Sequence, residues 1–178
     1  LSATKMILIG LGANLPSSEY GSPKDTLEAA LAMLAEADVT IERCSRWYTS
    51  PPVPPSDQPW YVNGVASIRT ALPATALLDN LHRVERELGR TRRTRWEARI
   101  VDLDLLVYGD EVIRGEGVSL AVPHPRLHER LFVLQPLAEI SSAWRHPVLG
   151  LTAVEMLAEL PSDPRIRPIQ EDSDLDGV

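Results

Sequence analysis

The sequence has few of the residues that mark secreted or membrane proteins. Cys44 is the only cysteine among 178 residues, so an internal disulfide is excluded, and we expect this thiol to be buried. No apolar run approaches the ~20 residues that span a bilayer, and residues 1–5 do not resemble a signal peptide. The net charge of -7 argues against general binding to nucleic acid or to a membrane surface. We therefore expect a soluble, cytoplasmic protein with no nucleic-acid partner and no membrane partner.

Hydrophobic periodicity and turn residues predict one domain over residues 1–160 and an acidic, disordered tail over residues 161–178. The proline-rich segment 50–59 is expected to form a stiff loop between two strands. Strands and helices alternate irregularly, which favours an α+β fold, with a mainly antiparallel sheet flanked by helices, over a doubly wound sheet. The expected strands cover residues 6–12, 39–49, 61–70 and 100–108, and the expected helices start at residues 22, 73 and 152.

Two acidic residues stand in the strand predicted for residues 100–108. Asp102 and Asp104 are two residues apart, so both carboxylates point to one face of the sheet. Two such carboxylates repel each other unless a cation is present, and hard oxygen ligands suit Mg²⁺ that also binds phosphates. The alternative is an exposed edge strand with acids on its solvent face. Glycosyltransferases also use an Asp-x-Asp motif with a divalent metal, so the pair alone names no reaction.

A run of arginines precedes this strand, with the sequence RTRRTR from Arg90 to Arg95. Arginine binds phosphate oxygens bidentately and stabilises charge on a transferring phosphoryl group. Trp96 follows the run and could cover a flat ligand by stacking. No P-loop motif occurs, so a nucleotide would bind in another way. The alternative is a solvated basic turn or a contact with nucleic acid.

Aromatic and polar residues flank the proline-rich loop and recur near residue 130. Tyr61 and Asn63 share one face of a predicted strand and can stack on, and hydrogen-bond to, a planar heterocycle. Phe132, the only phenylalanine, is a candidate for the opposite stacking partner. His124 and Arg130 precede it and can line a phosphate pocket. The alternative is that the aromatic residues belong to the core; we interpret the other histidines as structural or surface residues.

Together these motifs resemble the 6-hydroxymethyl-7,8-dihydropterin pyrophosphokinase family. They are collinear with the family between Met6 and Leu160, and the set Arg-x-x-Asp-x-Asp, Pro-His and the asparagine after the proline loop is specific as a whole. The matching segments are GANL at 12–15, YTSPP at 48–52, DQPWYVN at 57–63, Glu85 through Arg90, RW at 95–96 with Arg99, DLDL at 102–105, VPH at 122–124 and RLFVLQPL at 130–137.

The resemblance implies a ferredoxin-like α/β sandwich that transfers pyrophosphate from ATP to 6-hydroxymethyl-7,8-dihydropterin in folate biosynthesis, releasing AMP. It also implies two Mg²⁺ ions at Asp102 and Asp104, with ATP as co-substrate, and we expect a monomer. The implied catalytic residues are Arg90, Arg99, Asp102 and Asp104. The implied ATP-binding residues are Glu85, Arg92, Trp96, Arg99, Leu105, His124 and Arg130. The implied pterin-binding residues are Ser50, Pro51, Val53, Tyr61, Asn63, Trp96 and Phe132.

Two other readings remain open. One is a ferredoxin-like nucleotide- or RNA-binding module, although RNA-binding sheets of this fold carry aromatic residues where this chain carries Asp102 and Asp104. The other is an inactive homologue, because Glu97-Ala98 stands where the family usually has Gly-Pro. Mg²⁺-dependent binding of a non-hydrolysable ATP analogue would separate the enzyme from the RNA-binding module.

Overall fold

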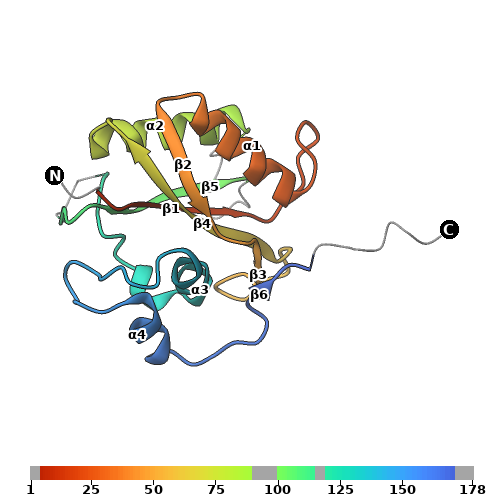
Figure 1. Cartoon of the computed structure of the whole chain (residues 1–178). Coiled ribbons are helices and arrows are strands. Elements are labelled where there is room, and N and C mark those ends of the chain that lie inside the picture. The colour runs from red at the N-terminus through yellow and green to blue at the C-terminus, as the bar shows by residue number, and fades with distance from the viewer. Residues whose placement is uncertain (1–4, 90–99, 115–118, 171–178) are drawn as a thin grey trace.

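The computed structural model describes residues 5–89, 100–114 and 119–170, and it forms three layers. Figure 1 shows α1 and α2 on one side of a central sheet and α3 and α4 on the other. The helices are α1 (Pro23–Ala35), α2 (Ala74–Glu87), α3 (Leu131–Ile140) and α4 (Ala153–Ala158), with a short 3-10 turn, η1 (Leu127–Glu129), before α3. The strands are β1 (Ile7–Ala13), β2 (Val39–Cys44), β3 (Tyr48–Ser50), β4 (Tyr61–Thr70), β5 (Asp102–Tyr108) and β6 (Arg167–Pro168).

The sheet is antiparallel at every described pairing. β1 lies between β4 and β5, while β2 and β3 pair one after the other with the far side of β4. The chain order β1-α1-β2-β4-α2-β5, with β5-β1-β4-β2 as neighbours in space, is the ferredoxin-like arrangement. The expected α+β class, with an antiparallel sheet flanked by helices, is therefore confirmed.

Side chains alternate between the two faces of each strand, so the sheet contributes to one hydrophobic core on each side. Ile9 and Leu11 of β1 pack with the buried residues of α1 and α2, and Leu103 of β5 joins them. Leu8, on the opposite face of β1, packs with Leu134 of α3. Helices therefore cover both faces of the sheet.

Local signals set the predicted helix ends. Ser22 accepts a hydrogen bond from the backbone N–H of Asp25, whose carboxylate accepts one from the Ser22 N–H in return, so the two residues form a capping box at the start of α1. Thr152 and Glu155 make the same reciprocal pair at α4. Gly89 has a φ of 91°, the left-handed conformation that commonly follows the end of a helix, here α2.

Several expectations were wrong in detail. The strand expected over residues 39–49 is two strands, because the chain leaves β4 at Trp47 and rejoins it as β3. Cys44 is exposed rather than buried, because it ends β2 in a stretch that faces solvent. The strand expected over residues 6–12 runs from Ile7 to Ala13.

Two elements were not predicted at all. α3 contains Pro136, which would end most helices but lies in its second turn, where only one backbone hydrogen bond is lost. β6 falls within the segment expected to be a disordered tail, and it pairs with β3. Residues 171–178 of that segment lie outside the described residues.

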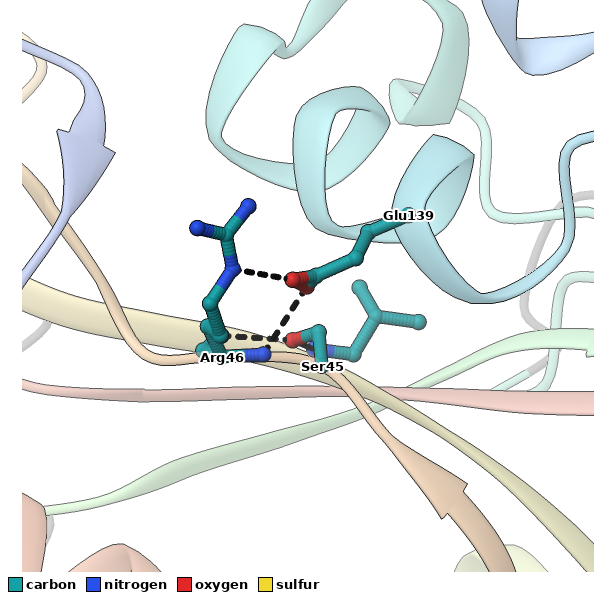
Figure 2. Close-up of polar contacts among 4 residues, drawn as sticks. Ser45, Arg46 and Glu139 are labelled. Atoms are coloured by element: carbon teal, nitrogen blue, oxygen red, sulfur yellow. Dashed lines mark hydrogen bonds and ion pairs between the residues drawn. The ribbon is translucent and has the colours of Figure 1, made fainter.

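The connection between β2 and β3 is fastened to α3 by polar contacts, shown in Figure 2. Arg46 donates hydrogen bonds to the Glu139 carboxylate from its backbone N–H (2.8 Å) and from its Nε. The Ser45 hydroxyl donates to the Arg46 carbonyl (2.7 Å) and accepts from the Val65 N–H (3.0 Å). The connection is thus tied to β4 on one side and to α3 on the other.

Candidate functional site

One cavity, of about 170 Å³, opens beside the ends of β1, β4 and β5, next to the start of α3. We call it the aromatic cavity because Tyr61 and Phe132 both line it. All the described residues that were predicted to bind the pterin lie here: Ser50, Pro51, Val53, Tyr61, Asn63 and Phe132. The structure therefore brings together residues from the proline-rich loop, β3, β4 and α3 that are up to 82 positions apart in the sequence.

Strand register places the polar groups of this cavity. Gly12 of β1 pairs with Asn63 of β4 on one side and with Asp102 of β5 on the other. Asn63 is 5% exposed, and its Nδ2 donates a hydrogen bond to the Ser50 hydroxyl, which fixes the orientation of the amide. Glycine has no side chain, so the space between Asn63 and Asp102 stays open to a ligand.

A second cavity, of about 250 Å³, lies between α2 and β5, and we call it the polar cavity. Three of the predicted ATP-binding residues line it: Glu85, Leu105 and His124. His82 also lines it, although we expected a structural or surface residue there. The spacing of His82 and Glu85, three positions apart on α2, is the signal that could have placed both side chains on one helix face.

The two aspartates join the cavities. Asp102 and Asp104 line both of them, while Leu103 and Leu105 between and after them pack into the core. The predicted projection of both carboxylates to one face is confirmed. A ligand in either cavity would therefore be within reach of the same pair of carboxylates.

The surroundings of the carboxylates are cationic. Arg130 lines the aromatic cavity, not the polar one; burial lowers the pKa of its guanidinium, and the nearby Asp104 and Asp102 act against that shift. Burial, together with Arg130 and Arg126, lowers the pKa of His124 to about 4, so this imidazole is neutral at pH 7. Its Nδ1 accepts a hydrogen bond from the Arg126 N–H (3.1 Å), which leaves Nε2 as the donor.

Other predicted residues lie outside the described ranges. Arg90, Arg92, Trp96 and Arg99 belong to this group, and their roles stay predictions. Within the described ranges, no three His, Cys, Asp or Glu side chains are grouped to hold a metal ion by themselves. A metal at Asp102 and Asp104 would need further oxygen ligands from water or from a substrate, as Mg²⁺ commonly has. No helix in the described part of the chain has the length and apolarity to cross a bilayer.

The sequence is similar to known proteins of one family. The model of the 7,8-dihydro-6-hydroxymethylpterin-pyrophosphokinase (HPPK) family matches residues 8–142. A 2-amino-4-hydroxy-6-hydroxymethyldihydropteridine pyrophosphokinase of Synechocystis sp. is 40% identical over 154 residues, 86% of this chain and 75% of that protein. The protein of the same name from Haemophilus influenzae is 45% identical over 135 residues, 75% of this chain and 80% of its own.

A solved structure shows the same fold. The crystal structure of Plasmodium falciparum HPPK-DHPS with STZ-DHP superposes with a TM-score of 0.65 over 88% of this chain, at 14% identity. The match spans 43% of that longer chain, so at this identity it bears on the fold alone. The family match covers most of the sequence, including both cavities. The chain belongs to the 7,8-dihydro-6-hydroxymethylpterin-pyrophosphokinase family.

Proposed function

We propose that this chain transfers pyrophosphate from ATP to 6-hydroxymethyl-7,8-dihydropterin and releases AMP, as a step of folate biosynthesis. The observation that carries the proposal is the pair of cavities with Asp102 and Asp104 as their common wall. A reaction between two bound substrates needs one site for each and a shared place where the reacting atoms meet. The aromatic cavity suits the pterin, and the polar cavity suits the nucleotide.

The pterin would bind flat in the aromatic cavity, with Tyr61 and Phe132 at its ring faces. Aromatic rings stack on planar heterocycles with little loss of conformational freedom. The Asn63 amide already donates to Ser50, so its Oδ1 is oriented to accept a hydrogen bond from a ring N–H. Backbone groups at Ser50 and Val53 would complete the recognition.

The residues at the common wall fit a magnesium site. Mg²⁺ is usually held by one or two carboxylates, with water and substrate phosphates as its other ligands, and Asp102 and Asp104 supply the carboxylates. Bound there, two Mg²⁺ ions would neutralise phosphate charge and favour attack by the substrate hydroxyl. Both carboxylates would thereby hold the triphosphate at the boundary between the cavities.

In the proposed reaction, the pterin hydroxyl oxygen forms a bond to the β-phosphorus of ATP. The bond from that phosphorus to the oxygen bridging the α- and β-phosphorus atoms breaks; AMP leaves with this oxygen, and the hydroxyl proton is released. Arg90 and Arg99 would stabilise the charge on the transferring group. Arg92 and Trp96 would cover the bound substrates, which would keep water from hydrolysing ATP.

The nucleotide would contact Glu85, Leu105 and His124 in the polar cavity, with Arg130 reaching the phosphates from the aromatic side. Because His124 is neutral at pH 7, it would act as a hydrogen-bond donor through Nε2 and not as a fixed charge. We propose that the protein works as a monomer in the cytoplasm, where a reducing environment would preserve the exposed Cys44 thiol.

The test is to incubate the protein with ATP, Mg²⁺ and 6-hydroxymethyl-7,8-dihydropterin and to identify the nucleotide that is released. We expect AMP, no AMP from Asp102→Asn, and unchanged AMP release from Asp110→Asn, which removes an exposed carboxylate beyond the end of β5. Release of ADP would contradict the proposed site of attack. An ATP analogue that binds only with Mg²⁺, without turnover, would favour the inactive homologue.

A further inference from the structure

A third cavity, of about 290 Å³, lies next to the polar cavity. We call it the histidine cavity because His124, His128 and His146 line it, together with Arg114. His124 and Pro125 also line the polar cavity, so they form the wall between the two. The proposed pyrophosphoryl transfer does not use this third space.

Arg114 brings a positive charge to the lining of the histidine cavity. Over the described ranges, no Asp or Glu lines it, and no carboxylate is within ion-pair distance of Arg114. Glu129 Oε1 lies 3.7 Å from His128 Nε2, but Oε2 of the same carboxylate lies 3.4 Å from Arg126 Nε, so its charge is shared. The lining therefore combines the cationic guanidinium of Arg114 with imidazoles, and none of its residues is acidic.

Burial and nearby cationic groups lower the pKa values of two of these imidazoles. Burial lowers the pKa of His146, and His128 and Arg114 lower it further. The pKa of His124 is lowered by burial and by Arg130 and Arg126. An anion in the cavity would offset the positive charges that act on both rings.

The backbone orients two of the rings as donors. His146 is 5% exposed, and its Nδ1 accepts hydrogen bonds from the Val148 and Leu149 N–H groups, each at 3.1 Å. Its neutral form therefore carries the hydrogen on Nε2. His124 is held in the same way by the Arg126 N–H. Since the Nε2–H of His124 is assigned to the nucleotide, the donors left for the histidine cavity are the fixed Nε2–H of His146 and the guanidinium of Arg114.

We propose that the histidine cavity binds a phosphate group, either as free inorganic phosphate or as part of a small phosphate monoester. A guanidinium and imidazole N–H groups are donors that suit phosphate oxygens. Val148 and Leu149, which also line the cavity, supply apolar surface for the carbon atoms of a monoester. The histidine cavity shares only His124 and Pro125 with the polar cavity and no residue with the aromatic cavity, so phosphate binding to it can be measured without either substrate.

The test is a titration of the full chain with inorganic phosphate at constant ionic strength, followed through the histidine side-chain NMR signals. We expect saturable shifts at His128 and His146. Arg114→Gln should weaken binding roughly 10-fold or more, because it removes a charge-assisted contact. Arg69→Gln, which removes an exposed arginine that pairs with Glu42 at 3.0 Å, is the matched control and should leave the affinity unchanged.

His128→Gln is a second variant, with the same expectation as Arg114→Gln, in case the latter fails to fold. Absence of saturation up to ~100 mM phosphate, or equal weakening by both arginine variants, would overturn the proposal. A phosphate that is displaced by a non-hydrolysable ATP analogue and shifts only the His82 signal would lie in the polar cavity. This result would also overturn the proposal. Tighter binding of glycerol phosphate than of inorganic phosphate would support a monoester ligand, and the reverse would support free phosphate.

Discussion

Gly12 is the position where a small change should separate pterin binding from nucleotide binding. A Cβ atom built at this glycine would lie 3.1 Å from Asn63 Oδ1, whereas an unstrained contact is about 3.5 Å. Gly12 lines the aromatic cavity but is not among the residues of the polar cavity. Gly12→Val adds two methyl groups beyond that Cβ, in a cavity of about 170 Å³.

The expected loss follows from overpacking. Extra carbon atoms in a filled space cost about 1–3 kcal/mol, which corresponds to a roughly 5- to 150-fold weaker affinity for the pterin. A glycine inside a strand is itself unfavourable by about 0.5–1 kcal/mol, so its replacement offsets part of the strain. The free energy of unfolding should therefore change by less than about 2 kcal/mol.

Isothermal titration calorimetry with the pterin, and separately with a non-hydrolysable ATP analogue and Mg²⁺, would measure both affinities. Gly12→Ala should show a smaller loss of pterin affinity than Gly12→Val, and both variants should keep the nucleotide affinity within about 3-fold. If a folded Gly12→Val bound the pterin as well as the native protein, the pterin would not lie beside Asn63. An equal loss for both ligands would mean that the substitution disturbs the sheet and not the cavity.

Three further predictions concern the metal site, pH and folding. Asp104→Asn should abolish Mg²⁺-dependent nucleotide binding and lower turnover by about 10²–10³-fold, while the circular dichroism spectrum stays native; equilibrium dialysis with and without Mg²⁺ would measure the binding. Because the pKa of His124 is lowered to about 4, the unfolded chain binds this proton more readily, so stability should be full above pH 6.5 and fall between pH 6.5 and 4. Urea denaturation across this range should show a smaller decline for His124→Gln, and an identical decline would refute the assignment. Ser22→Ala should lower the free energy of unfolding by about 1 kcal/mol, measured in the same way, whereas no change would mean that the capping box contributes nothing.

The fold could be predicted where the signals are local. The Ser22 and Thr152 caps, Gly89 at the end of α2 and the alternation of apolar residues in β1 and β5 depend on neighbouring residues in the chain. α3 was missed because its sequence, LFVLQPL, is apolar without helical periodicity and contains Pro136. Its helical form depends on packing against Leu8 and Val65 of the sheet, which no local pattern reveals.

Part of the site could also be predicted from local sequence patterns, and part could not. Asp102 and Asp104 could be placed on one face from their spacing, and the residues of the aromatic cavity followed from the resemblance to a known family. Arg130 was expected at a phosphate pocket, but which cavity it lines, like the cavity that His82 lines, depends on where α2 and α3 dock on the sheet. The histidine cavity could likewise not be predicted, because His146 lies in a turn 22 positions beyond His124 and only the fold brings the two side chains to one cavity.

β6 has a consequence for how the protein behaves at high concentration. An open strand edge can template the strand of another molecule and so start aggregation. β6 pairs with β3 through only two residues, and one of them, Pro168, has no N–H group to offer to a further strand. This short terminal segment thereby shields the edge next to β3, the strand that carries Ser50 into the aromatic cavity. A segment with no catalytic group can in this way protect the β3 edge of the sheet from pairing with another molecule.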